Sequence, residues 1–81
     1  MKRRAISNHP EAPRLTDRQL EIWRRLVAGQ SGKWMACEMG MTDAAISNHK
    51  TRLLANIGAT SNEDAVRIAV RWGVGKREAV A

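Results

Sequence analysis

The fold is decided by residues 31–57, which read SGKWMACEMGMTDAAISNHKTRLLANI. Ser31 is a favourable N-cap for a short helix, and Gly40 can end that helix in the left-handed conformation that glycine tolerates. Thr42 can then cap a longer helix over residues 43–57. A short helix, a tight turn and a longer helix are together typical of a helix-turn-helix.

Two further helices flank this pair in the sequence. Thr16 and Gln19 have the spacing of a capping box and predict a helix that runs to about residue 28. Ser61 can cap a fourth helix over residues 62–72. No strand is predicted, because alternation of apolar and polar residues is nowhere sustained. The sequence therefore predicts an all-α fold, a compact four-helix bundle.

Length and charge suggest one small domain with a polyanionic partner. The chain has 81 residues, with 14 Lys and Arg against 8 Asp and Glu, a net charge of +6 that favours nucleic acid over a membrane surface. Four basic residues against one acid stand in residues 1–14, which also contain both prolines and show no period. We expect a flexible basic arm over residues 1–14, a helix-turn-helix domain over residues 15–72 and a short tail over residues 73–81.

The sequence offers no signal for enzymatic chemistry. Cys37 is the single cysteine, and His9 and His49 stand far apart without metal-ligand spacing, so we expect no catalytic residue, no metal and no cofactor. No apolar run approaches the length of a membrane span, and no signal peptide is recognisable. We therefore expect a cytoplasmic protein without a membrane partner.

The helix over residues 43–57 has one apolar and one small polar face. At about 100° per residue, Leu53 and Ile57 fall within about 20° of Ile46, and the three form a stripe expected to be buried. The opposite face consists of Ala44, Ser47, Asn48, Thr51, Arg52 and Ala55. Small and hydrogen-bonding side chains allow close approach to another surface and can bond to base edges, although an ordinary solvent-exposed face remains an alternative.

The helix over residues 62–72 has a second strip of side chains off its inward face. The inward face is expected to contain Ala65, Ile68, Ala69 and Trp72. The second strip consists of Glu63, Val66, Arg67 and Val70. In a two-fold dimer this strip would meet itself, with valine against valine and Glu63 able to pair with Arg67. We expect a weak homodimer through this helix.

Residues 15–70 resemble the LuxR-type (GerE-type) helix-turn-helix domain. The landmarks that carry the resemblance are Leu15, Thr16, Arg18, Glu21, Gly29, Ser31, Lys33, Ala36, Ile46, His49, Gly58, Ala65, Val66 and Ala69. The resemblance implies four helices that bind double-stranded DNA as a dimer, with residues 43–57 in the major groove and residues 62–72 as the dimer contact. It also implies a regulator of transcription.

The resemblance assigns roles to particular side chains. It implies that bases are read at Ser47, Asn48 and Thr51, and the outward face adds Arg52 to this set. The phosphate contacts that it implies are Ser31, Gly32, Lys33 and Thr42. Lys50 stands about 40° from the buried stripe, and its stem can extend outward to a phosphate.

Several positions depart from the family pattern. Ala45 lacks the usual threonine hydroxyl, and the cations frequent at the positions of Ser47 and Asn56 are missing. Trp34 replaces a glutamate and is expected near the edge of the short helix, whereas Trp23 and Trp72 are expected in the core.

Two functions remain open at this point. The first is a stand-alone transcriptional regulator, since fourteen residues before the domain cannot form the receiver or ligand-binding domain usual in the family. The alternative is an adaptor of the same fold that binds another regulator or RNA polymerase rather than DNA.

Overall fold

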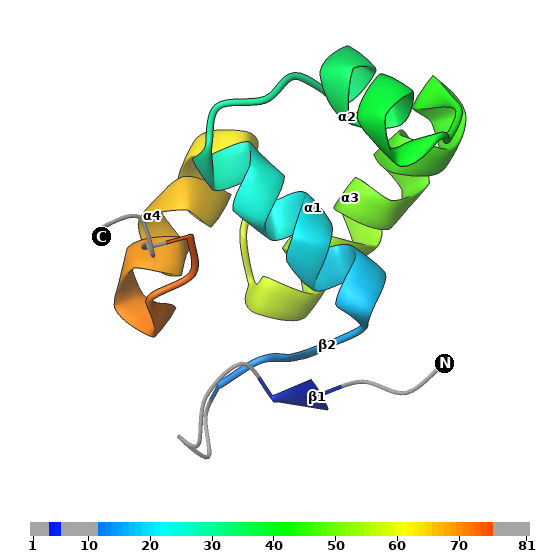
Figure 1. Ribbon diagram of the computed structural model, residues 1–81. Helices are drawn as coiled ribbons and strands as arrows, with labels where there is room; N and C mark the ends of the chain where they lie inside the picture. The colour runs from blue at the N-terminus through cyan, green and yellow to red at the C-terminus, as the bar shows by residue number, and fades with distance from the viewer. Residues whose placement is uncertain (1–3, 6–11, 76–81) are drawn as a thin grey trace.

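The computed structural model describes residues 4–5 and 12–75 (Figure 1). The elements in this part are β1 (Arg4–Ala5), β2 (Arg14–Leu15), α1 (Asp17–Val27), α2 (Gly32–Met39), α3 (Asp43–Ile57) and α4 (Asn62–Trp72). Helix α1 crosses the middle of the view, with α4 to its left and α2 to its upper right (Figure 1). The predicted all-α helix-turn-helix bundle is confirmed.

Each helix begins at a hydroxyl side chain that accepts a hydrogen bond from a backbone N–H in the first helical turn. The N-caps are Thr16, Ser31, Thr42 and Ser61, each with a bond of 3.0–3.1 Å. The side chain of Gln19 also accepts from the backbone N–H of Thr16 at 3.1 Å, which completes the predicted capping box. All four predicted starts are confirmed.

The turn between α2 and α3 is short because Gly40 has a left-handed backbone, with φ of +66°. This conformation lets the Met41 N–H donate to the Ala36 carbonyl at 2.9 Å, so the end of α2 is satisfied before α3 starts. Met41 itself is half-buried against the core. The glycine therefore ends α2 directly before the N-cap of α3.

The core is organised around Trp23 of α1. Its ring is fully buried, and its indole N–H donates to the carbonyl of Ala65 in α4 at 2.8 Å. The other buried apolar side chains are Ala12, Leu15, Ile22, Leu26, Met35, Ala36, Ile46, Leu53, Ile57, Ala65, Ala69 and Val74. The predicted core position of Trp23 is confirmed, and Trp72 is half-buried against the same cluster.

A short strand pair, which the sequence did not predict, lies before α1. Arg4 pairs with Leu15 and Ala5 with Arg14 in an antiparallel arrangement. The prediction of no strand is wrong here, because two paired residues are too few to show alternation in the sequence. Ala12 and Leu15 of the same region are buried. The rest of the predicted arm, residues 1–3 and 6–11, lies outside the described residues, as does most of the predicted tail, residues 76–81.

Val74 belongs to the core, although the sequence division put it in the tail. The side chain is only 8% exposed and packs with the core cluster. Gly73 has a left-handed backbone with φ of +71°, which lets the Val74 N–H donate to the Ala69 carbonyl at 2.9 Å. An apolar residue directly after such a glycine often packs back onto the helix that has just ended.

We predict that Val74→Ala lowers the free energy of unfolding by about 1–2 kcal/mol, because it removes two buried methyl groups. Val70→Ala is the matched control, since the same change at a side chain that is 79% exposed should have little effect. Urea unfolding of both variants, followed by circular dichroism, measures the difference. Equal stabilities would mean that the domain ends with α4.

The start of α4 is held by a carboxylate as well as by its N-cap. The backbone N–H and the hydroxyl of Thr60 donate to Asp64 at 3.0 and 3.1 Å, and Arg67 forms an ion pair with the same carboxylate. The N–H of Thr60, followed by the guanidinium of Arg67, lowers the pKa of Asp64 below its ordinary value. The ionised form of Asp64 is therefore the one that the folded chain favours.

We predict that Asp64→Asn destabilises the protein at neutral pH and flattens its loss of stability in acid. A depressed pKa gives stability that is present above the unfolded value, about 3.9, and lost as the pH falls through the lower folded value. The stability gap between the two proteins should therefore close below about pH 4. Urea unfolding between neutral and acid pH measures this gap, with Glu63→Gln as the control. A gap that stays constant would contradict a role for the charge of Asp64.

Candidate nucleic-acid interface

Helix α3 turns one face to the core and the other to solvent. Ile46, Leu53 and Ile57 are buried, so the predicted apolar stripe is confirmed. The four side chains predicted to read bases are all exposed, and they are Ser47, Asn48, Thr51 and Arg52. Because the buried stripe anchors the helix along most of its length, these four side chains are held on one rigid surface.

This exposed face is chemically available for recognition. Within the described residues, none of the four side chains has a hydrogen-bond or ion-pair partner. Asn48 can donate and accept at the same time, Ser47 and Thr51 can do either, and Arg52 presents a planar cationic fork. No bulky apolar side chain stands among them. The face can therefore approach a polar surface closely and form hydrogen bonds there.

The residues predicted to contact phosphates lie at the starts of α2 and α3. Ser31 and Thr42 are exposed, and their oxygens accept the capping bonds, which leaves each hydroxyl hydrogen to donate to another group. Gly32 is half-buried and Lys33 exposed in the first turn of α2, where backbone N–H groups lack intrahelical acceptors. Lys50 is half-buried, in keeping with a stem that lies along the helix.

One arginine of α1 also forms an ion pair with α2. Arg25 of α1 binds Glu21 of its own helix at 2.9 Å and Glu38 of α2 at 2.5 Å. The two carboxylates, Glu21 first, raise the pKa of the Arg25 guanidinium above its ordinary value. This cation is therefore occupied within the domain, whereas Lys33, Lys50 and Arg52 have no ion-pair partner among the described residues.

Asn56, one of the departures from the family pattern, is bound inside the domain. Its amide nitrogen donates to Gln19 at 3.3 Å, on the oxygen that also accepts from the N–H of Thr16. Gln19 is itself buried. The capping role of Gln19 is visible in the sequence, but this second bond is not, because its partner is distant in sequence. The bond ties the last turn of α3 to the first turn of α1.

The strip predicted as a dimer contact is on the surface of α4. Glu63, Val66, Arg67 and Val70 are all exposed. Val66 is 36% exposed and Val70 79%, so the prediction that these valines lie outside the core is confirmed. In the single chain Arg67 is paired with Asp64, so a pair with Glu63 of another copy would share an arginine that already has a partner.

Trp34 is 56% exposed at the start of α2, beside the loop of residues 29–31. Its predicted place at the edge of α2 is confirmed. Cys37 is also exposed, and His49 is half-buried.

In the part of the chain that the structure describes, no helix has both the length and the apolar character that a membrane span requires. In the same part, no three histidine, cysteine or acidic side chains come together as metal ligands would.

Comparisons with known proteins identify the family of this chain and a structure of similar fold. The family described as "Bacterial regulatory proteins, luxR family" (GerE) matches residues 13–69, more than half of the chain. The transcriptional regulatory protein MctR of Rhizobium johnstonii is 33% identical over 60 residues, which cover 74% of this chain and 28% of MctR. A crystal structure of Vibrio cholera VqmA with ligand and DNA has a TM-score of 0.76 at 22% identity, over 88% of this chain and 31% of VqmA. The chain thus spans less than a third of each relative, and the likeness to VqmA shows the fold alone.

Proposed function

Since the chain belongs to the luxR family of bacterial regulatory proteins, as its sequence predicted, we propose that it binds a specific DNA sequence and regulates transcription. The proposal rests above all on the exposed face of α3, where four hydrogen-bonding side chains lie opposite a buried stripe. Helical geometry predicted this face without reference to any family. The same function is supported by MctR, a transcriptional regulatory protein, and by VqmA, whose structure is of a complex with ligand and DNA.

In this proposal α3 enters the major groove of DNA, which is wide enough to admit a helix. Asn48 forms two hydrogen bonds with an adenine, and Arg52 is suited to a guanine. Ser47 and Thr51 bond to neighbouring base edges. Since all four extend from one rigid helix, their spacing along α3 sets which base pairs they reach.

The sugar–phosphate backbone is bound on either side of α3. Contacts from Lys33 and Lys50 supply positive charge, and the hydroxyls of Ser31 and Thr42 donate to phosphate oxygens. Gly32 contributes a backbone N–H without a side chain in the way. These contacts fix the position of α3 on the duplex but do not select a sequence.

We predict that Asn48→Ala relaxes base preference more than it weakens overall binding. A bidentate asparagine–adenine contact contributes about 1–3 kcal/mol of discrimination. Sites selected from random DNA are titrated in moderate salt with the wild type, with Asn48→Ala and with Asn62→Ala, an exposed asparagine on α4 that serves as the control. If Asn48→Ala keeps the full difference between matched and mismatched sites, Asn48 does not read a base.

We further propose that two copies bind together, through Glu63, Val66, Arg67 and Val70. The exposed valines stand one turn apart on α4, so a two-fold axis across α4 brings them onto the same residues of a second copy. So small a patch supports weak association in solution, which two adjacent half-sites on DNA would strengthen.

We predict that Val70→Asp abolishes cooperative binding to a two-fold symmetric site and spares binding to a half-site. Val70→Lys is the matched control for charge, because it adds a cation that DNA attracts but disrupts the same apolar contact. Both variants should bind as single copies, which sedimentation with DNA measures, and circular dichroism checks their fold. Dimeric binding by both variants would show that α4 is not the interface.

The alternative function is an adaptor that binds another regulator or RNA polymerase through the same fold. The missing cations at Ser47 and Asn56 favour it, and so does the hydrogen bond that holds Asn56 to Gln19. A gel shift with genomic fragments distinguishes the two functions. Sequence-selective shifts support the regulator, whereas capture of a regulator in the absence of DNA supports the adaptor. The stand-alone arrangement and the cytoplasmic location stay predictions.

A further inference from the structure

Trp34, in the first turn of α2, leaves more than half of its surface in solvent. Trp23 is fully buried by contrast, and Trp72 is half-buried. An indole combines a large apolar surface with one polar N–H, and such side chains are common at interfaces. In the part of the chain that the structure describes, the indole N–H of Trp34 has no hydrogen-bond partner. Both the ring and the N–H are therefore available to another molecule.

The indole forms one side of a shallow hollow of about 370 Å³ at the start of α2. The other lining residues are Gly29, Gln30 and Ser31, so no charged side chain lines the hollow. Side chains in a helix point toward its N-terminus, and those of the first turn therefore lie toward the preceding loop. The ring of Trp34 is thus placed beside Ser31, one of the residues proposed to bind phosphate.

The loop beside the indole is held in place by α1. The backbone N–H of Gln30 donates to the carbonyl of Arg25 at 3.0 Å, and the side-chain oxygen of Gln30 accepts from the Arg25 guanidinium at 3.0 Å. The N–H of Gly29 donates to the carbonyl of Leu26, also at 3.0 Å. These three bonds fix the shape of the loop on which the hollow depends.

The start of α2 lies against the half of α3 that is proposed to read DNA. A β-carbon added at Gly32 would be 4.0 Å from the side chain of Ile46, the residue before Ser47. DNA that receives α3 in its major groove has a sugar–phosphate strand along each edge of that groove. Trp34, which closely follows Gly32 in the chain, is therefore placed to meet one of these strands.

The charges around the indole also suit a DNA strand. Lys33, the preceding residue, is exposed and has no ion-pair partner within the described residues. Glu38, the one acidic residue of α2, lies one turn after Trp34 on the same face, and it is paired with Arg25. A phosphate beside the indole would therefore meet a cation, while the carboxylate of the same helix is already neutralised.

We infer that Trp34 packs onto the sugar–phosphate backbone of DNA, an inference that rests on the proposed DNA binding. The ring covers the apolar face of a deoxyribose, and the indole N–H donates to a phosphate oxygen of the same strand. The faces of bases inside a duplex are stacked on one another and closed to the ring, whereas the sugars are on the outside. Such a contact holds the protein on the duplex without selecting a sequence.

Quenching of tryptophan fluorescence by acrylamide tests this contact, because a neutral quencher is not repelled by DNA. In the free full-length chain, the exposed Trp34 should be quenched strongly and the buried Trp23 weakly. A saturating duplex that contains a site selected from random DNA should lower the quenching of Trp34 several-fold. Trp34→Phe is the control for the other two tryptophans, and its quenching should be nearly the same with and without DNA.

The anisotropy of a dye on the DNA measures binding of the duplex separately. If the duplex binds and Trp34 stays as accessible to acrylamide as in the free chain, the inference is wrong, while the proposed DNA binding stands. The indole would then be left to a protein partner. If no duplex binds, the proposed function and this inference fail together.

Trp34→Ser should weaken binding to matched and mismatched sites by the same factor, about tenfold, because it removes an apolar contact with the backbone. Trp34→Phe keeps a ring without the N–H, so its affinity should lie between those of Trp34→Ser and the wild type. Cys37→Ser changes another exposed side chain of α2 and is the control that should bind as the wild type does. Circular dichroism checks the fold of all three variants. An unchanged affinity of Trp34→Ser, or a loss confined to matched sites, would overturn the backbone contact.

Discussion

The indole of Trp23 connects the two ends of the domain. It is fully buried in α1, and its N–H donates to the carbonyl of Ala65 in α4. A buried indole N–H without an acceptor costs about 1–3 kcal/mol, so this bond strongly favours one position of α4 along α1. Ala65 and Ala69 are small and buried, which allows α4 to approach α1 closely. This close contact places the inward face of α4 against α1 and leaves the valine strip exposed.

The same central helix orients the proposed recognition helix. Gln19 near the start of α1 binds Asn56 near the end of α3, and Arg25 near the end of α1 binds Glu38 of α2. These contacts and the buried stripe hold α3 from behind and at its C-terminal end. In its N-terminal half Ile46 is buried, and the opposite face, which contains Asn48, is left to solvent. The face of α3 that we propose reads DNA is therefore held in place by the folded domain itself.

The sequence by itself determined the four helices and the faces of α3. Thr42 and Gly40 act on backbone groups within a few residues of themselves, so their effect is visible in the sequence without any tertiary contact. The burial of Ile46 and the exposure of Asn48 likewise follow from the period of the helix. The landmark residues of the luxR family lie at these caps and on these helix faces. The family was therefore recognisable from the sequence.

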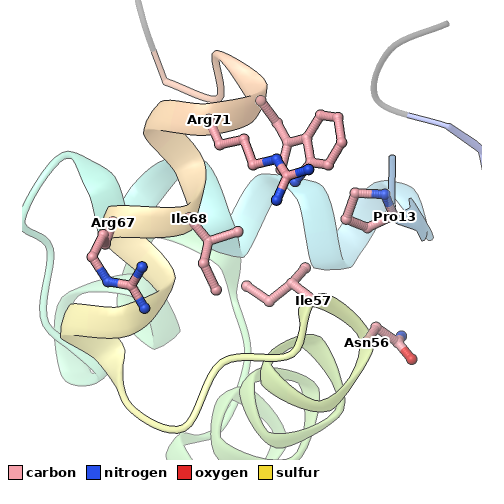
Figure 2. A pocket seen from close by; sticks show the side chains of 7 residues that line it. Pro13, Asn56, Ile57, Arg67, Ile68 and Arg71 are labelled. Atoms are coloured by element: carbon pink, nitrogen blue, oxygen red, sulfur yellow. The ribbon is translucent and has the colours of Figure 1, made fainter. Parts of the chain in front are cut away.

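Tertiary structure alone decided the contacts between residues distant in sequence. The pairing of β1 with β2, the bond from Asn56 to Gln19 and the burial of Val74 all depend on segments brought together by folding. The cleft between α3 and α4 is a further case, since Ile57 and Ile68, which line it, belong to different helices (Figure 2). Such contacts arise from packing, and periodicity and capping report only on neighbours along the chain.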